Sequence, residues 1–267
     1  MKSPTHSFYR YLEAAYDHFN KALFNGRLPT CLLTVQREKN VMGYFSANRW
    51  TDPQGTVVHE IAVNPAYFAR HNLLEVMQTI VHEMVHNWQH CFGKPSRNGY
   101  HNKEWAEKMD LIGLIPSSTG RPGGRRTGQK VSDYPRPGGA FERATRAFIR
   151  QSKGLPWVDR IAALSPSCQQ REKDVAWDED LADLETDARV EEEQLAALLH
   201  CPISELFQDL VPSEQLQLAA RKKVKSRYTC PHCRTNVWGK PGLKLVCGEC
   251  GDAYGEHETV LRISDLS

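Results

Sequence analysis

The sequence predicts an α+β chain, in which an opening helix, a small antiparallel sheet and an apolar helix precede a small cysteine-rich ribbon. Three observations lead to this prediction. Apolar residues recur at helical spacing from 73 to 92, and three short strand-like runs lie between 31 and 63. Two Cys-x-x-Cys pairs lie near the C-terminal end.

The chain has 267 residues, enough for one domain of ordinary size and a smaller one. We expect an α+β domain at 1–118, a basic lid or linker with an acidic helical insert at 119–220, and the ribbon at 221–267. The net charge of +2 conceals three runs of opposite sign. These runs are basic from Arg121 to Arg150, acidic from Glu172 to Glu193 and basic again from Arg221 to Lys244.

The first ten residues lack the apolar core of a secretory signal, and no run approaches the roughly 20 apolar residues of a membrane span. Four of the eight cysteines are paired as Cys-x-x-Cys, which is typical of a metal site in a reducing compartment. We therefore expect a soluble cytoplasmic protein without membrane partners. The other cysteines are isolated and predict buried small hydrophobes.

The individual elements follow from periodicity and from turn residues. Apolar spacing predicts an opening helix over 7–24, which Asn25-Gly26 ends. Strands are predicted over 31–35, 41–47 and 56–63, the first two joined by a polar turn. If the third strand is the sheet edge beside the apolar helix, it would hold an extended peptide by backbone hydrogen bonds. Helices are predicted over 102–112, 140–149, 177–199 and 203–220. The segment 117–139 is rich in Gly, Pro, Ser and Arg without an apolar period, so we expect it to be a mobile basic segment or a lid.

The apolar helix carries His82-Glu83-Met84-Val85-His86. Residues four apart lie on one helix face, so both imidazoles can bind the same metal ion. Glu83 lies beside that face, where its carboxylate can reach a metal-bound water. The motif thus predicts a zinc hydrolase centre with Glu83 as the base; the alternative is a pair of hydrogen-bonded core histidines.

A third ligand must come from elsewhere in the chain. His90 lies eight residues from His82, about 12 Å along the helix axis, which is too far for one ion. We favour His101, because a loop of this length can fold back and imidazole matches the other ligands, and we retain Glu104 and Glu107 as alternatives. His59 lies on a predicted strand and is expected to be exposed.

The C-terminal ribbon is predicted from Cys230, Cys233, Cys247 and Cys250. Two knuckles of this spacing form a closed tetrahedral site for a structural zinc ion. Basic and aromatic side chains surround it, and this combination suits single-stranded nucleic acid. The predicted contacts are Arg221, Lys222, Lys223, Lys225, Arg227 and Trp238. The alternative is a solvated cationic face above a small aromatic ribbon core.

The chain resembles the SprT-like family of zinc metallopeptidases, which includes the DNA–protein crosslink protease Spartan. The resemblance covers about residues 8–116 and includes Gly43-Tyr44-Phe45, the His-Glu-x-x-His helix and Gly99-Tyr100-His101. Between the ribbon knuckles, Val237-Trp238-Gly239-Lys240-Pro241-Gly242 is similar to the family's C-terminal zinc ribbon. The intervening residues, about 120–220, match no part of the family that we can place.

The resemblance implies a zincin-like fold with a catalytic zinc ion held by His82, His86 and His101, with Glu83 as the base. It also implies a zinc-dependent endopeptidase that acts on proteins bound or crosslinked to single-stranded or damaged DNA, nucleoid-associated if the source is prokaryotic. The competing hypothesis is a non-proteolytic nucleic-acid-binding or transcription-associated module with structural zinc. Glu83 favours catalysis, because a purely structural site needs no base.

Overall fold

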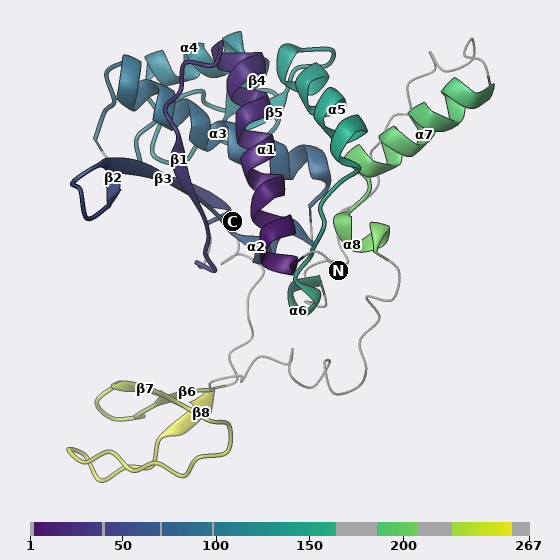
Figure 1. Cartoon of the computed structure of the whole chain (residues 1–267). Helices are drawn as coiled ribbons and strands as arrows, with labels where there is room; N and C mark the ends of the chain where they lie inside the picture. Colours follow the sequence, from purple (N-terminus) through teal and green to yellow (C-terminus); the bar gives the residue numbers. More distant parts are fainter. Residues whose placement is uncertain are drawn as a thin grey trace. The chain divides into compact units, whose positions relative to one another are not determined.

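The computed structural model describes residues 3–38, 41–69, 71–97, 99–163, 186–207 and 226–257. They belong to two compact units, within Met1–Leu210 and Val211–Ser267. Figure 1 labels the elements. The first unit contains α1 (Pro4–Phe24), β1 (Cys31–Val35), β2 (Gly43–Thr51), β3 (Val57–Val63), α2 (Pro65–Phe68), α3 (Leu73–Phe92), α4 (Lys103–Leu111), β4 (Leu114–Ser117), β5 (Ser132–Pro135), α5 (Ala140–Ser152), α6 (Arg160–Ala163), α7 (Thr186–His200) and α8 (Ile203–Leu206). The second contains β6 (Ser226–Thr229), β7 (Asn236–Gly239) and β8 (Gly255–His257).

Helix α3 lies at the centre of the first unit and has the bounds that its apolar period predicts. It begins at a capping box, in which the Asn72 side chain accepts a hydrogen bond from the Glu75 backbone and Glu75 accepts one from the Asn72 backbone. Its apolar residues are buried on most sides, including the fully buried Met77 and Met84. Because α3 is fixed along its whole length, the side chains that it presents are held rigidly.

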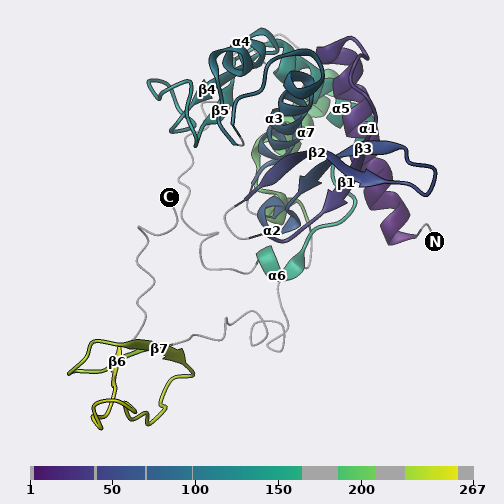
Figure 2. The same ribbon diagram turned by 90° about the vertical axis from the view of Figure 1, so that its left-hand side faces the viewer.

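The three-stranded sheet packs one face against α1 and α3 (Figure 2). Its strand order is β1-β3-β2, with β1 parallel and β2 antiparallel to β3. The predicted fully antiparallel sheet is therefore wrong, and the third strand does not lie at the edge. Alternation along a strand identifies its faces but does not identify its neighbours. The strand at the free edge next to α3 is β2.

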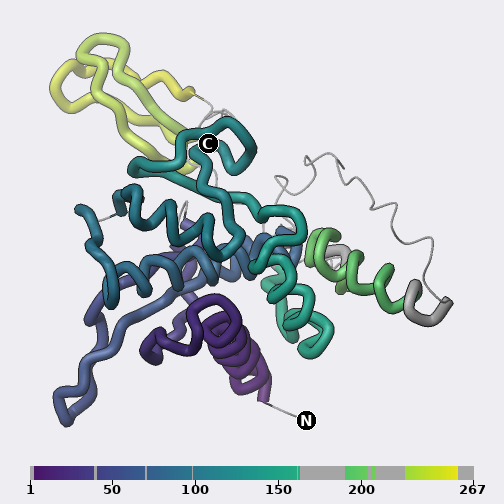
Figure 3. Tube along the Cα trace, turned by 90° about the horizontal axis from the view of Figure 1, so that it is seen from above, coloured from purple at the N-terminus to yellow at the C-terminus, as the bar shows by residue number. Residues whose placement is uncertain are grey.

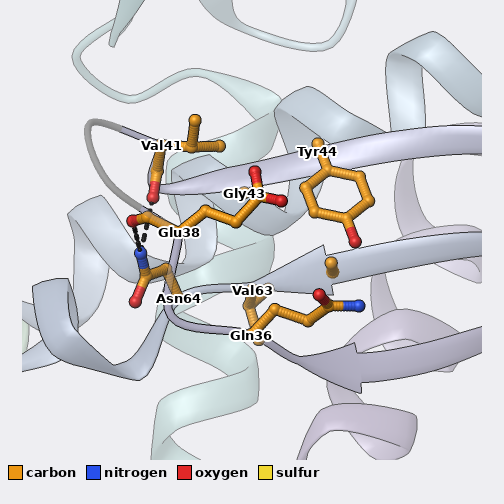
Figure 4. A pocket seen from close by; sticks show the side chains of 8 residues that line it. Gln36, Glu38, Val41, Gly43, Tyr44, Val63 and Asn64 are labelled. Atoms are coloured by element: carbon orange, nitrogen blue, oxygen red, sulfur yellow. Dashed lines mark hydrogen bonds between the residues drawn. The ribbon is translucent and has the colours of Figure 1, made fainter.

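The connection between β1 and β2 explains this order. The Asn64 amide, just beyond the end of β3, donates hydrogen bonds to the carbonyls of Glu38 and Val41 at 2.7 and 2.8 Å (Figure 4). These bonds hold the connection across the end of β3, so that β2 pairs on the far side of β3 instead of forming a hairpin with β1. The most buried strand of the sheet, β3, is thereby covered on both edges, with Ile61 only 1% exposed.

The segment after α4 is ordered, which contradicts our prediction of a mobile basic segment. β4 and β5 form an antiparallel pair with Ile115 opposite Tyr134. The segment runs alongside α3 and α4 (Figure 3), and the backbones of His101 and Gly128 exchange hydrogen bonds of 2.9 and 3.0 Å. Its order comes from polar contacts with the rest of the unit and from the buried side chain of Val131, and neither produces an apolar period in the sequence.

The later helices complete the core. α5 packs on α1 through Phe141 and Phe148, and α7 packs on α5 and buries Leu199. Arg146 and Arg150 of α5 form ion pairs with Glu192 of α7. The acidic helix predicted over 177–199 is described from Thr186 to His200, and 177–185 lie outside the described residues. The helix predicted over 203–220 ends at Leu206, and 208–220 lie outside the described residues.

The second unit is a small sheet with strand order β7-β6-β8. Tyr228 and Cys230 are fully buried and form its centre. None of the described helices, which all belong to the first unit, combines the length and apolar character needed to cross a lipid bilayer.

Candidate metal centre

Three histidines converge beside the middle of α3. His82 and His86 lie one turn apart on the helix, and His101 comes from the loop immediately before α4. The Nε2 atom of His101 lies 3.2 Å from the Nε2 atoms of both His82 and His86. The three ligand atoms all lie within 4.8 Å of one another. The structure therefore brings together the three histidines that the sequence analysis selected.

The spacing fits one zinc ion. Two nitrogens that each lie about 2.0–2.1 Å from an ion, at a tetrahedral angle, are about 3.3 Å apart. The two measured separations of 3.2 Å agree with that value. Three imidazole nitrogens that face one another so closely need a proton or a metal ion between them, so this set of donors fits a metal site.

The protonation of the metal-free histidines supports the same conclusion. Burial and the neighbouring His82 lower the pKa of His86 to about 2 and that of His101 to about 4. Both rings are neutral at pH 7 and offer lone pairs. Burial opposes the charged form of His82, but its hydrogen bond to Asp133 and the charges of Glu83 and Asp133 raise its pKa.

The other proposed ligands lie apart from this cluster. Glu104 accepts hydrogen bonds from the Gln89 amide and the Lys94 backbone, at 2.8 and 2.7 Å. Glu107 pairs with Lys103 on the surface. His90 packs against His59, with 5.0 Å between ring centroids, and takes no part in the three-histidine cluster.

His59 corrects one detail of our prediction, because it is half-buried and not simply exposed. Its Nδ1 accepts a hydrogen bond from the Asn48 backbone at 3.0 Å, and its Nε2 lies 3.7 Å from the Cys91 thiol. Asn48 has a positive φ of 51° at the irregular part of β2. His59 therefore supports the bend of this strand.

Glu83 follows the first histidine and is 7% exposed. Burial raises the pKa of this carboxyl group, and the charge of Asp133 adds to the effect. The positive form of His82 and a hydrogen bond from the Phe45 backbone N–H oppose it. Because Phe45 is in β2, this hydrogen bond places the edge strand beside the predicted base.

Trp105 forms the floor of the cluster and was missed by the sequence analysis. Its indole lies against all three imidazoles, with centroid separations of 4.9 Å to His82, 5.4 Å to His86 and 4.3 Å to His101. The side chain is fully buried. Its position four residues after His101, one turn into α4, was the available signal.

Asp133 and Gly128 were also missed, because both lie in the segment expected to be mobile. The Nδ1 atom of His82 lies 2.8 Å from Oδ2 of Asp133, and Nδ1 of His101 lies 3.1 Å from the Gly128 carbonyl oxygen. Asp133 is one of only two acidic residues in the basic run from Arg121 to Arg150. An isolated carboxylate in a basic run was a signal that the analysis did not use.

Four cysteines converge in the second unit. Cys230, Cys233, Cys247 and Cys250 place their sulfur atoms within 4.8 Å of one another, with 3.7 Å between Cys233 and Cys247. Two thiolates about 2.3 Å from a zinc ion at a tetrahedral angle are about 3.8 Å apart. The cluster is consistent with a zinc site.

The cysteine knuckles form tight turns. The backbone N–H of Arg234 donates to the Cys230 carbonyl, and that of Gly251 donates to the Cys247 carbonyl. Both Arg234 and Gly251 have positive φ, at 63° and 75°. The turns direct the two thiols of each pair to the same point.

The predicted nucleic-acid contacts are described only in part. Arg221, Lys222, Lys223 and Lys225 lie outside the described residues. Arg227 and Trp238 are directly opposite each other on β6 and β7. Arg227 is exposed and Trp238 is 62% exposed. Tyr228, by contrast, is buried in the ribbon core.

Residues 12–121 match the SprT-like family. The chain belongs to the SprT-like family. A Salmonella typhimurium relative, "Uncharacterized protein in mucB 3'region", is 48% identical over 59 residues, which are 22% of this chain and 80% of the relative. No solved structure gives a significant match. The family match of this SprT-like chain includes His82, His86, Glu83 and His101 but ends before Asp133.

Proposed function

We propose that this SprT-like protein is a zinc-dependent endopeptidase that cleaves proteins bound or crosslinked to DNA. The observation that carries the proposal is the convergence of the three histidines next to the buried Glu83. A site that only stabilised the fold would have no use for a carboxylate of raised pKa beside its ligands.

His82, His86 and His101 would hold the catalytic zinc ion. When bound, zinc acts as a Lewis acid that polarises a carbonyl group and makes water a stronger nucleophile. Glu83 accepts the proton of the attacking water and transfers it to the leaving amine. The raised pKa of Glu83 favours proton uptake, because it makes the carboxylate a stronger base than an ordinary exposed one.

The free edge of β2 provides a binding surface for an extended polypeptide. β3 occupies the other edge of β2, so a substrate strand would pair along the side on which the Phe45 N–H reaches Glu83. Main-chain hydrogen bonds along such an edge hold a peptide with little dependence on its sequence. This supports a protein substrate and a broad cleavage preference.

The ribbon supports the DNA part of the proposal. On its sheet, Arg227 lies between Trp238 and His257 in the cross-strand register, and all three side chains are exposed. An exposed indole can stack on a base while the guanidinium contacts a phosphate. We propose single-stranded or damaged DNA as the ligand of this surface, and a cytoplasmic location, associated with the nucleoid if the source is prokaryotic.

The decisive experiment measures cleavage of a DNA-bound protein with and without single-stranded DNA. Glu83→Gln should lower the rate by about 10²–10⁴, the usual contribution of a general base, and should still bind zinc. Glu107→Gln is the matched control, because that residue pairs with Lys103 on the surface and its side chain is 64% exposed. The control should cleave at the wild-type rate.

The result also separates the proposal from the competing binding module. A wild-type protein with two zinc ions that cuts nothing under any DNA condition would exclude the peptidase and favour the module. Equal rates for wild type and Glu83→Gln would exclude Glu83 as the base.

The ribbon surface has its own test. Trp238→Ala should weaken binding of single-stranded DNA by about 5- to 150-fold, corresponding to about 1–3 kcal/mol for one stacked base. Trp157→Ala, which removes a 48% exposed indole from the first unit, should leave affinity unchanged. Wild-type affinity should fall steeply with salt, and a flat response would exclude phosphate contacts.

A further inference from the structure

The segment from the start of β4 to Arg136, here called the β4–β5 segment, accepts hydrogen bonds from the outer nitrogens of two of the three histidines. Oδ2 of Asp133 lies 2.8 Å from Nδ1 of His82, and the Gly128 carbonyl lies 3.1 Å from Nδ1 of His101. Both acceptors require the proton on Nδ1 of the neutral ring, so Nε2 is left with its lone pair. One segment of about twenty residues thereby selects the tautomer of two ligands.

Asp133 itself is held firmly in place. It lies in β5 opposite Pro116, and its backbone carbonyl accepts a hydrogen bond from the Gln78 amide of α3 at 2.7 Å. The same helix therefore carries both His82 and the residue that fixes the position of Asp133. This arrangement orients the carboxylate toward the imidazole from two sides.

The Asp133 carboxylate is only half satisfied inside the fold. The residue is 5% exposed, and within the described part of the chain its Oδ1 atom is buried without a hydrogen-bond partner, whereas Oδ2 pairs with His82. The unpaired oxygen costs free energy, which the pair with His82 offsets. A buried carboxylate that keeps one oxygen unpaired beside a histidine of the cluster is expected to serve the site.

We propose that Asp133 is a positioning residue for the zinc centre, which orients His82 and increases its strength as a ligand. The inference rests on the proposed catalytic zinc site. A carboxylate on the outer nitrogen of a ligating histidine fixes the ring and makes it more basic, and removal of such a partner weakens metal binding by about 10- to 100-fold.

The experiment compares zinc affinity at the histidine site in full-length variants, by chelator competition. Asp133→Asn retains an acceptor of the same shape but removes the charge, and Asp133→Ala removes both. We expect about 10- to 100-fold weaker binding for Asp133→Asn and a larger loss for Asp133→Ala, with the cysteine site unchanged. Cobalt substitution distinguishes the sites, because only the cysteine site has thiolate ligands.

Asp110→Asn is the matched control. Asp110, on α4, forms ion pairs with Arg126 and Arg136 of the same β4–β5 segment but lies outside the histidine cluster. It tests whether loosening the segment is enough to weaken zinc binding. We expect its zinc affinity to equal that of the wild type.

Thermal unfolding of the metal-free variants separates positioning from a structural role. The midpoint for Asp133→Asn should stay close to that of the wild type, because the amide oxygen still accepts the His82 hydrogen bond, and the lost charge interaction is offset by the lost cost of burying the charge. Two results together would overturn the proposal: a lower midpoint for Asp133→Asn, and a loss of zinc affinity in Asp110→Asn equal to that in Asp133→Asn.

His101→Ala separates this inference from the proposed function. If His101→Ala loses one zinc ion while Asp133→Asn binds zinc as tightly as the wild type, the positioning role is wrong and the zinc site stands. If His101→Ala retains both ions, the catalytic zinc site is wrong and the inference fails with it.

Discussion

Trp105 offers the most direct test of how the metal centre is built. The indole is fully buried and contacts all three histidine rings, at centroid distances of 4.3–5.4 Å. Replacing it by alanine removes the floor of the cluster and leaves a cavity. Trp-to-Ala changes in a core cost about 3–5 kcal/mol, and we expect Trp105→Ala to lower the free energy of unfolding by that amount.

Trp105→Phe should be much milder. Within the described part of the chain, the indole Nε1 is buried and has no hydrogen-bond partner. An unpaired buried N–H costs about 1–3 kcal/mol, so its removal offsets part of the free energy lost with the smaller ring. We expect Trp105→Phe to retain most of the stability of the wild type.

Urea unfolding of the metal-free, full-length protein measures both effects, with the helical signal reporting the first unit, which contains all the described helices. Leu111→Ala is the control on the same helix, because Leu111 is 76% exposed and its replacement should change stability by less than about 0.5 kcal/mol. A loss below about 1 kcal/mol for Trp105→Ala would refute the description of this residue as the packed floor. An equal loss for Trp105→Phe would refute the argument from the unpaired N–H.

Three further outcomes are expected. Gly43→Ala should lower the free energy of unfolding by about 1–3 kcal/mol and also reduce the rate of cleavage. The added Cβ would lie 2.9 Å from the Ala62 carbonyl oxygen and 3.4 Å from Cγ of Glu83. A urea midpoint equal to that of the wild type would contradict this prediction. The free energy of unfolding should fall as the pH rises from 9 to 11. Burial raises the pKa of the Cys31 thiol from its ordinary 9.0 to about 11, so the thiol of the unfolded chain loses its proton at a lower pH than that of the folded chain. Cys31→Ala should reduce this dependence of the free energy of unfolding on pH. Cys230→Ser should speed amide hydrogen exchange in β6 and β7, because it removes one residue of the cysteine cluster, and should leave the amides of α3 protected. Equally faster exchange in the ribbon strands and in α3 would contradict the division into two separate units.

The helices and the two histidines of α3 could be predicted because their signals are local. The capping residue Asn72, the apolar period and the spacing of His82 and His86 all act within a few turns of one helix. The cysteine knuckles could be predicted for the same reason. His101 required a loop to fold back, and chemical similarity of the ligands was sufficient to favour it over Glu104.

The sheet order could not be predicted, because it depends on contacts between distant residues. Alternation located β1 and β3, but the parallel pairing of Leu33 with Ile61 depends on the connection that Asn64 holds across the end of β3. The order of the β4–β5 segment escaped prediction for a similar reason. Asp133 and Gly128 are ordered by bonding to histidines that are 51 and 27 residues away.

The metal centre is therefore assembled from three separate parts of the chain. α3 supplies two histidines and Glu83, the loop before α4 supplies His101, and the β4–β5 segment supplies Asp133 and Gly128. Such a site does not exist in the unfolded chain, so the free energy of metal binding also stabilises the folded arrangement. The contribution should fall mostly on the β4–β5 segment, because α3 is already fixed by its long apolar face, whereas the segment combines the buried Val131 with hydrogen bonds to two of the histidines. Zinc would thus further stabilise a segment that in turn holds the proposed zinc ligands in place.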